Sequence, residues 1–493
     1  MRFAARFCAV MLLTLLFAGL ATAAVTVTLS SKTGPPTTNL QVGGTGFPLS
    51  TTVDVYFDTS DMALAVTDAT GAFSGIGIVV PASAVPGAHW VTAVARGTSG
   101  TAAQAAFTVQ ANWAEFHYSA LGRGRNPYEN VLTPTTVGNM DLDWTYTTAG
   151  ALTSSPAVVK GVVYVGSADD NIYAINGSSG ALVWKYATGK SIVDSSPAVV
   201  GGTVYIGSSD DNVYAINASK GTLVWKYKTG GAVNSSPAVA NGVVYVGSSD
   251  DNLYAISTST GALDWKYKTG GAVNSSPAVA NGVVYVGSDD GGVYALDAST
   301  GIEYWDFTTG GKVFSSPAVA NGVVYVGSDD SNFYALNISN GTVVWQFAGT
   351  GAFESSPAVA NGVVYVGSDA GAFYGLNARN GGQIWVVTSA TAVVVSPPAF
   401  AAGMVYFGLG SRVYAVENVV TPQFLWTGTT GAAVVSSPAV ANGVLYISSE
   451  DGRLHAYDLT AGNMAKHFKP PARPKPAMLR PNLELQPSNS PLS

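Results

Sequence analysis

Short apolar runs of strand length recur in a fixed order along most of the chain. In one copy the runs cover residues 272–280, 283–287, 293–297 and 303–307, and Asn-Gly at 281–282 separates the first two. Asn-Gly between two apolar runs is typical of a β-hairpin turn. The second run reads Val-Val-Tyr-Val-Gly. Because it is apolar at successive positions, we expect a sheet that is covered on both faces.

These runs belong to a unit that repeats every 40 or 41 residues. Each copy contains one proline at the same place, and these prolines are Pro156, Pro197, Pro237, Pro277, Pro317, Pro357, Pro398 and Pro438. A fixed period of this size is typical of repeat folds. Four short strands in each repeat indicate the blades of a propeller. We therefore predict an all-β fold with an eight-bladed propeller over residues 141–465.

Tryptophans recur at the same spacing, and we interpret them as docking residues between blades. They are Trp144, Trp184, Trp225, Trp265, Trp305, Trp345, Trp385 and Trp426. Trp144 precedes the first unit, whereas no tryptophan follows the last unit, which starts near Ser436. We therefore predict that residues 141–148 supply the outer strand of the eighth blade. Closing the ring in this way removes the exposed edges of the sheets.

The segments before the repeats differ in composition. Residues 1–23 combine a charged start, an apolar stretch and Ala-Thr-Ala at 21–23, which is typical of a secretory signal cleaved near Ala23. We therefore expect a secreted or periplasmic protein. The single cysteine, Cys8, lies inside this signal, so the mature chain has no thiol nucleophile and no cysteine metal ligand. Residues 25–110 alternate in short β-prone runs, which predicts a small β-sandwich.

A linker and a tail complete the predicted organisation. In the linker, residues 111–140, aromatic residues are interleaved with Gly-Arg-Gly-Arg-Asn-Pro at 122–127. We expect the aromatics to dock the linker on the side of the propeller; the alternative is that arginines and aromatics form a binding patch. Residues 466–493 are rich in proline and basic residues and show no hydrophobic period. This composition predicts a disordered tail.

Charge narrows the expected partners. Residues 141–465 contain 12 Lys and Arg against 23 Asp and Glu. An acidic surface repels phosphate backbones, so we expect no nucleic-acid partner. No apolar run after the signal is long enough to span a membrane, so we expect no transmembrane segment. We also expect a monomer.

A turn motif precedes most of the tryptophans. One copy reads Ala295-x-Asp297-x-x-Thr300-Gly301-x-x-x-Trp305. It resembles the tryptophan-docking motif of pyrroloquinoline-quinone-type (PQQ-like) propeller repeats. We interpret the small residue as room for an indole from the neighbouring blade, the Asp as a turn cap and the Gly as a position of positive φ. Residues 25–110 resemble the immunoglobulin-like (Ig-like) modules of secreted bacterial proteins.

The resemblance to the PQQ-like family implies two kinds of function. Family enzymes hold the quinone beside a Ca²⁺ site of Glu, Asn and Asp, with a base Asp and vicinal cysteines, whereas other members use the propeller only for binding. The mature chain has no cysteine, and its repeats lack the long insertions that build the quinone pocket. We therefore predict a non-enzymatic member with no catalytic residues and no bound quinone.

Acidic pairs follow the second run of most units. Among them, Asp210, Asp211, Asp250 and Asp251 are candidate metal ligands. One interpretation is a rim that attracts cations such as Ca²⁺, which prefers oxygen ligands. The other is that Asp favours tight turns and keeps the rim soluble. The sequence leaves both open.

One position varies sharply between otherwise similar units, the residue just before the Ser-Ser-Pro triplet. Its occupants are Thr153, Asp194, Asn234, Asn274, Phe314, Glu354, Val395 and Val435. The preceding residue is nearly always Val, so alternation turns the variable side chain away from the blade core. We predict that Asp194, Asn234, Asn274, Phe314 and Glu354 lie at the mouth of the channel as candidate binding residues. Simple drift at a tolerant site is the alternative.

Together these patterns predict a non-catalytic binding or scaffold protein of the cell envelope with a protein or glycan partner. The competing hypotheses are a quinone-dependent dehydrogenase and a carbohydrate- or wall-binding module.

Overall fold

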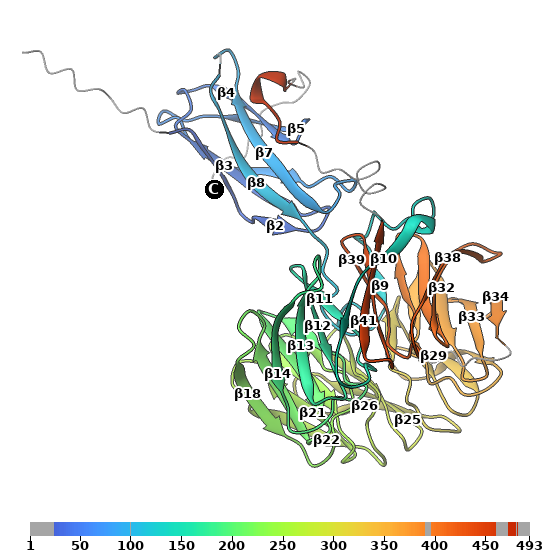
Figure 1. Ribbon diagram of the computed structural model, residues 1–493. Coiled ribbons are helices and arrows are strands. Elements are labelled where there is room, and N and C mark those ends of the chain that lie inside the picture. Colours follow the sequence, from blue (N-terminus) through green and yellow to red (C-terminus); the bar gives the residue numbers. More distant parts are fainter. Residues whose placement is uncertain (1–23, 99, 390–395, 460–471, 480, 482–493) are drawn as a thin grey trace, which may run out of the picture.

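The computed structural model describes residues 24–98, 100–389, 396–459, 472–479 and 481 (Figure 1). Regular structure in these residues is strand, apart from two short 3₁₀ helices, η1 (Val137–Asn139) and η2 (Pro476–Met478). The predicted all-β class is therefore confirmed. No helix in the described residues is long and apolar enough to cross a membrane. The predicted signal segment 1–23 lies outside them.

The N-terminal part of the described chain folds into two sheets around one core, and we call it the N-terminal unit. One sheet has the order β1 (Thr26–Leu29), β3 (Asn39–Thr45), β6 (Phe73–Val79). The other has the order β2 (Thr33–Gly34), β8 (Ala102–Val109), β7 (Gly87–Ala95), β4 (Thr52–Phe57), β5 (Ser60–Val66). Alternate side chains of these strands point to the same face, so Val53, Val91 and Phe107 are buried between the sheets.

Eight further sheets lie between residues 140 and 459 of the described chain, and we number them 1 to 8. Sheets 1 to 7 each contain four consecutive antiparallel strands. The innermost strands of sheets 1 to 8 are β11 (Ala157–Val159), β15 (Ala198–Val200), β19 (Ala238–Ala240), β23 (Ala278–Ala280), β27 (Ala318–Ala320), β31 (Ala358–Ala360), β35 (Ala399–Ala401) and β39 (Ala439–Ala441). The second strands are β12 (Val162–Gly166), β16 (Thr203–Ser208), β20 (Val243–Gly247), β24 (Val283–Gly287), β28 (Val323–Gly327), β32 (Val363–Gly367), β36 (Met404–Leu409) and β40 (Val444–Ser449).

The outer half of each sheet follows the same plan. The third strands are β13 (Asn171–Asn176), β17 (Asn212–Asn217), β21 (Asn252–Ser257), β25 (Gly292–Asp297), β29 (Asn332–Asn337), β33 (Ala372–Asn377), β37 (Arg412–Glu417) and β41 (Arg453–Leu459). The outermost strands of sheets 1 to 7 are β14 (Leu182–Ala187), β18 (Leu223–Lys228), β22 (Leu263–Lys268), β26 (Glu303–Thr308), β30 (Val343–Ala348), β34 (Gln383–Thr388) and β38 (Gln423–Thr429).

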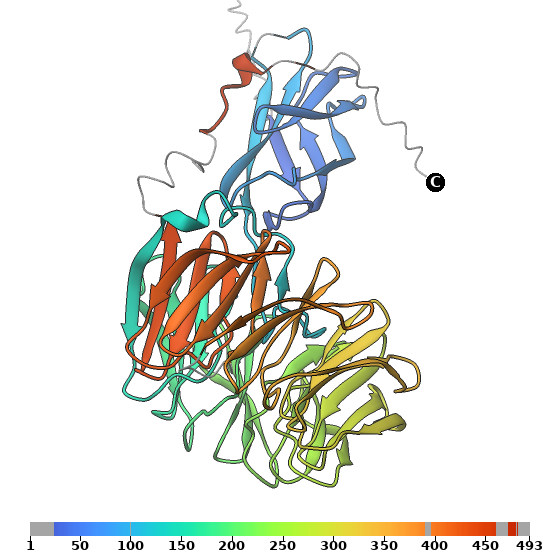
Figure 2. The ribbon, with the colours of Figure 1, turned by 90° about the vertical axis from the view of Figure 1, so that its right-hand side faces the viewer.

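Sheet 8 takes its outermost strand from the other end of the repeat region. Strand β10 (Met140–Thr147) pairs with β41, and the register places Trp144 opposite Ala456. The sheet order is β10-β41-β40-β39. Each innermost strand contacts the innermost strand of the next sheet, and β39 contacts β11. The sheets therefore form a closed ring (Figures 1 and 2).

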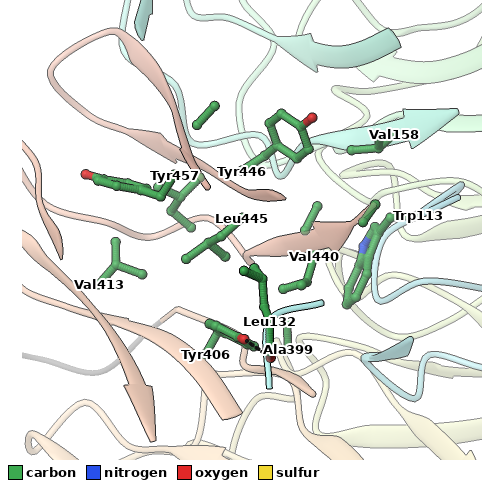
Figure 3. Packing of buried hydrophobic residues seen from close by; sticks show 14 of the residues in the cluster. Trp113, Leu132, Val158, Ala399, Tyr406, Val413, Val440, Leu445, Tyr446 and Tyr457 are labelled. Atoms are coloured by element: carbon green, nitrogen blue, oxygen red, sulfur yellow. Dashed lines mark hydrogen bonds between the residues drawn. The ribbon is translucent and has the colours of Figure 1, made fainter. Parts of the chain in front are cut away.

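A large core joins the two ends of the ring. Figure 3 shows Leu132, which precedes β10, among Tyr406 and Ala399 of sheet 7 and Val440 of sheet 8. Tyr406 Oη donates a 3.1 Å hydrogen bond to the Leu132 carbonyl. Trp113 is buried in the same cluster. Residues between the N-terminal unit and sheet 1 thus help to bury the core where sheets 7, 8 and 1 meet.

Two expectations need correction. The run 272–280 was predicted as one strand, but β23 covers only Ala278–Ala280, because the Ser-Ser-Pro triplet belongs to the connection between sheets. The tail, residues 466–493, was predicted to be disordered, yet its residues 472–479 lie against the N-terminal unit (Figure 1). There Arg473 lies over the ring of Trp90. Apart from residue 481, the rest of the tail lies outside the described residues. The composition of the tail could not predict this contact, because the aromatic surface that binds the tail belongs to the N-terminal unit.

Candidate binding site at the channel

The inner wall of the ring carries a belt of serine hydrogen bonds. In sheets 1 to 6 the hydroxyl of the second serine of each Ser-Ser-Pro triplet accepts a hydrogen bond from the backbone amide of the equivalent serine one sheet earlier around the ring, at 2.8 to 2.9 Å. The series is Ser437, Ser155, Ser196, Ser236, Ser276, Ser316 and Ser356, and the amide of each serine donates to the hydroxyl of the next one named. In sheet 7 the position is Pro397, which has neither an amide hydrogen nor a hydroxyl. The belt is therefore interrupted there.

The chain itself fills one end of the channel. Residues 113–126, which we call the plug, hydrogen bond to the innermost strand of all eight sheets. Each contact is made at the middle residue of the strand, and these residues are Val158, Val199, Val239, Val279, Val319, Val359, Phe400 and Val440. The expectation that the linker docks on the side of the propeller is therefore wrong. Inner strands present unpaired backbone groups to the channel, and the plug satisfies them.

The plug makes its contacts in two ways. At most sheets a plug carbonyl accepts the amide, as Ala114 does from Val199 at 2.7 Å. At sheet 7 the plug is a short strand, β9 (Arg125–Asn126), that pairs in parallel with β35. At sheet 3 the amide of Val239 reaches the carboxylate of Glu115 instead.

Two ionisable plug residues are deeply buried. Burial raises the pKa of Glu115 to about 8 and lowers the pKa of His117 to about 4. Glu115 Oε2 and His117 Nε2 have no hydrogen-bond partner among the described residues. Both line a small void of about 10 Å³. That volume is close to what one water molecule needs.

Beyond the plug the channel is open and forms a cavity of about 460 Å³. This size lies in the range of small-ligand pockets. Its lining contains Phe116, Thr153, Ser155, Asp194, Asn234, Ser236, Asn274, Ser276, Phe314, Ser316, Glu354, Pro397 and Val435. All five predicted channel-mouth residues are in this set. Val395 lies outside the described residues.

Sequence comparison missed several lining residues. Phe116 comes from the plug, whose course no repeat pattern predicts. Ser155, Ser236, Ser276 and Ser316 also line the cavity, and the signal for them in the sequence is that this serine is nearly invariant among the repeats. Pro397 stands out in the same comparison as the exception among those serines.

The two carboxylates of the lining belong to sheets 2 and 6. Burial in the cavity wall raises the pKa of Asp194, and the charge of Glu450 adds to the effect. Burial also raises the pKa of Glu354, with further contributions from Asp329 and Asp369. Neither lining carboxylate forms an ion pair with a described residue. The lining therefore contains two acidic groups, neither of which is paired with a cation of the described residues.

The acidic pairs are not equivalent around the ring. One acid of most pairs accepts hydrogen bonds that join its own turn to the connection from the previous sheet, and we call this acid the staple. Asp210, for example, accepts hydrogen bonds from the Asn212 and Gly189 amides and from Tyr214 Oη. Although burial opposes it, hydrogen bonding holds the pKa of Asp210 below its usual value. Asp250 makes the same contacts in sheet 3.

The other member of the pair changes sides. In sheets 1 to 3 it follows the staple, at Asp170, Asp211 and Asp251, where φ is +70°, +67° and +66°. In sheets 4, 5 and 8 the second acid instead precedes the staple. Sheet 6 has an acid at this preceding position but no staple. In the order of sheets 4, 5, 6 and 8, these residues are Asp289, Asp329, Asp369 and Glu450. We call these four residues the acidic arc. No group of three or more acidic or histidine side chains in the described residues is placed to hold a metal.

One lysine lies beside the acidic arc. Lys312 Nζ is 3.3 Å from Asp289 Oδ2 and 5.2 Å from the ring centroid of Phe314. Burial raises the pKa of Asp329, with Asp369 and Asp289 adding to it and Lys312 opposing it. Asp329 Oδ1 is buried without a hydrogen-bond partner among the described residues. An ammonium group between a carboxylate and an aromatic face is thus already present at this mouth.

The tryptophans hold the sheets together, with one change to the predicted geometry. The indole of Trp225 packs on Gly261 of the next sheet, where a Cβ would come within 2.8 Å of the ring. Its Nε1 donates to the Thr258 carbonyl at 2.9 Å. The small residue Ala215 instead lies opposite Trp225 in its own sheet. The glycine, rather than the alanine, therefore makes room for the neighbouring indole.

The comparisons with known proteins agree with this architecture. The sequence profile of a family described as outer membrane protein assembly factor BamB matches residues 190–277 and 268–468, more than half of the chain. No curated protein sequence matches the chain.

Three solved structures show the same fold. BamB from Moraxella catarrhalis is 16% identical, covers 65% of this chain and 99% of its own, and has a TM-score of 0.57. Quinohemoprotein alcohol dehydrogenase from Comamonas testosteroni is 15% identical, with 71% and 80% covered and a TM-score of 0.61. A europium-containing methanol dehydrogenase is 13% identical, with 71% and 98% covered and a TM-score of 0.63. The length of the profile match shows that the chain belongs to the BamB-type family of PQQ-like β-propeller proteins.

Proposed function

We propose that the chain is a non-catalytic binding protein of the cell envelope, an eight-bladed propeller with an Ig-like module, that binds basic groups of a partner protein in its channel. The observation that carries the proposal is the cavity with one end filled by the plug and with carboxylates at the other. The family description, which refers to outer-membrane assembly, supports an envelope location and a protein partner.

Lys312 suggests how such a group would bind. A partner's lysine or arginine would place its cation near Glu354 and the acidic arc and its apolar stem against Phe314 or Phe116. Cations bind the faces of aromatic rings as well as carboxylates. Because the carboxylates are partly desolvated, an incoming cation gains more there than at an exposed acid.

The lining does not fit a quinone cofactor. Pyrroloquinoline quinone is a tricarboxylate and needs cationic partners. The lining contains two carboxylates and neither Lys nor Arg. Residues 390–395, outside the described chain, contain no basic residue either. Lys226 and Lys266 are exposed on outermost strands, over Tyr214 and Tyr254. Lys312, the lysine described at this mouth, is already paired with Asp289, so the lining offers no unpaired cation for the three carboxylates of the quinone.

Calorimetry with small probes tests the proposal. We expect N-acetyl-lysine amide and N-acetyl-arginine amide to bind, and their uncharged analogues not to bind. Binding should weaken at high salt. It should also weaken at least tenfold in the double variant Asp194→Asn, Glu354→Gln. The matched control is Asp264→Asn, an exposed acid on an outermost strand.

The other outcomes separate the alternatives. Equal binding of charged and uncharged probes would contradict a cation site. Binding of cell-wall glycans in an array, unaffected by the double variant, would favour a carbohydrate-binding module. Stoichiometric uptake of quinone and Ca²⁺ with substrate-dependent dye reduction would overturn the non-catalytic assignment.

A further inference from the structure

The outer face of the five-stranded sheet in the N-terminal unit is covered although it faces away from the core. Tyr56 of β4 and Thr92 of β7 lie opposite each other in the ladder, and they are 1% and 0% exposed. Their neighbours Val91 and Phe57 point into the core. Side chains alternate between the faces of a strand, so Tyr56 and Thr92 belong to the outer face. Something other than the core must bury them.

The C-terminal segment 472–479 lies on this face. The Arg473 guanidinium is 4.5 Å from the ring centroid of Trp90, and Arg473 Nε donates a 2.6 Å hydrogen bond to Gln104 Oε1. Gln104 Nε2 in turn donates to the carbonyl of Pro474 at 2.9 Å. Pro474 is buried. One glutamine thus holds both the side chain of one tail residue and the backbone of the next.

The receiving face is pre-arranged. Thr92 and Gln104 are directly paired across β7 and β8, and Gln104 Nε2 also donates to Thr92 Oγ1 at 2.9 Å. Trp90 lies two residues before Thr92, on the same face. The aromatic platform and the amide clamp therefore lie side by side on two paired strands. A third strand, β4, contributes the buried Asp54, which Arg96 binds through both carboxylate oxygens.

The segment has the chemistry to match. From Lys469 onward every basic residue is followed by proline, at Lys469, Arg473, Lys475 and Arg480. A residue before proline prefers an extended backbone, so these dipeptides lose little conformational entropy on binding. Residues 25–110 contain four Asp against one Lys and one Arg, whereas the tail is basic. Opposite charges favour the contact.

We propose that the Trp90–Gln104 face is a recognition site for an Arg-Pro segment and that its resident ligand, bound within the same molecule, is the chain's own segment 472–479. The segment follows the last sheet, whereas the site precedes the first. Docking therefore ties the N-terminal unit to the ring by a second connection, besides the linker. The site is independent of the channel.

Peptide binding to the full-length chain tests the proposal. The probe is a fluorescein-labelled peptide of residues 472–479, and the readout is anisotropy. The wild-type site is occupied, so we expect weak binding. In the full-length double variant Arg473→Ala, Pro474→Ala the resident segment is released, and we expect at least tenfold tighter binding. A peptide with Arg473→Ala should not bind either protein.

Further variants keep the test decisive. Adding Trp90→Ala to the double variant should abolish peptide binding, whereas adding Val79→Ala, at an exposed position on the other sheet, should not. Equal binding to wild type and double variant, or no binding to either, would overturn the proposal. Sedimentation should give a monomer for wild type; a dimer lost in the double variant would show that the segment docks between molecules and would overturn the assignment within one molecule.

Discussion

Sheets 2 to 5 and sheets 7 and 8 are built from the same repeat but reach different solutions. Each of sheets 2 to 5 is one continuous stretch of chain. Sheet 7 adds the plug strand β9, and sheet 8 takes its outer strand β10 from before the repeats. Serines complete the belt in sheets 2 to 5, whereas Pro397 interrupts it in sheet 7. The repeat therefore builds the regular sheets, and the departures from it occur at the two sheets that take a strand from before the repeats.

The largest expected effect comes from removing the borrowed strand of sheet 8. Deleting residues 141–147 leaves β41 as an open edge that other chains can pair with. We expect aggregation and loss of the cooperative melting transition, measured by light scattering and circular dichroism. A deletion variant that stays monomeric and melts like wild type would show that β10 does not close the ring.

A regular junction should break almost as severely. Trp265→Ala removes an indole that packs on Gly301 and donates to the Ala298 carbonyl at 3.0 Å. We expect a loss of about 3–5 kcal/mol in the free energy of unfolding, as for other large-to-small changes in cores. Val224→Ala, at an exposed position of an outermost strand, is the control and should stay within about 0.5 kcal/mol. A small loss at Trp265 would mean that the junctions are not where stability resides.

A smaller effect concerns the contact between the plug and sheet 3. The folded-state pKa of Glu115 is raised to about 8. The unfolded chain therefore releases this proton at lower pH than the folded chain, and stability falls as pH rises from about 4.5 to 8. Glu115→Gln removes this dependence. We expect its melting temperature, relative to wild type, to rise steadily between pH 5 and pH 8, and a constant difference would contradict the buried neutral carboxyl.

The smallest effect compares two equivalent tryptophans. Trp385 Nε1 has no hydrogen-bond partner among the described residues, unlike Trp265 Nε1. Replacement by Phe keeps one aromatic ring but removes the N–H donor, and the loss of ring size is the same at both positions. We expect Trp265→Phe to cost about 1 kcal/mol more than Trp385→Phe, measured by denaturant unfolding. Equal costs would show that the regular and irregular junctions are energetically alike.

The sequence predicted what the repeat determines. The strand runs, the glycine turns and the tryptophan spacing depend on local periodicity, and a difference between aligned units located Asp194 and Glu354 on the cavity wall. The path of residues 113–126 could not be predicted, because the edges of eight separate strands fix it. Whether the second acid of a pair precedes or follows the staple can be predicted from the sequence, but only if the repeats are aligned on the staple acid rather than on the pair.

The plug has a consequence for how the molecule is assembled. Its residues precede all eight sheets of the ring in the chain, so the plug is synthesised before the sheets that surround it. Strand β10 is also synthesised long before its partner β41, because Met140 pairs with Leu459, more than 300 residues later in the chain. Contacts this distant in sequence form slowly. A chain that stops before β41 leaves both the plug and β10 incompletely paired, so only a full-length product hides its edges from proteases.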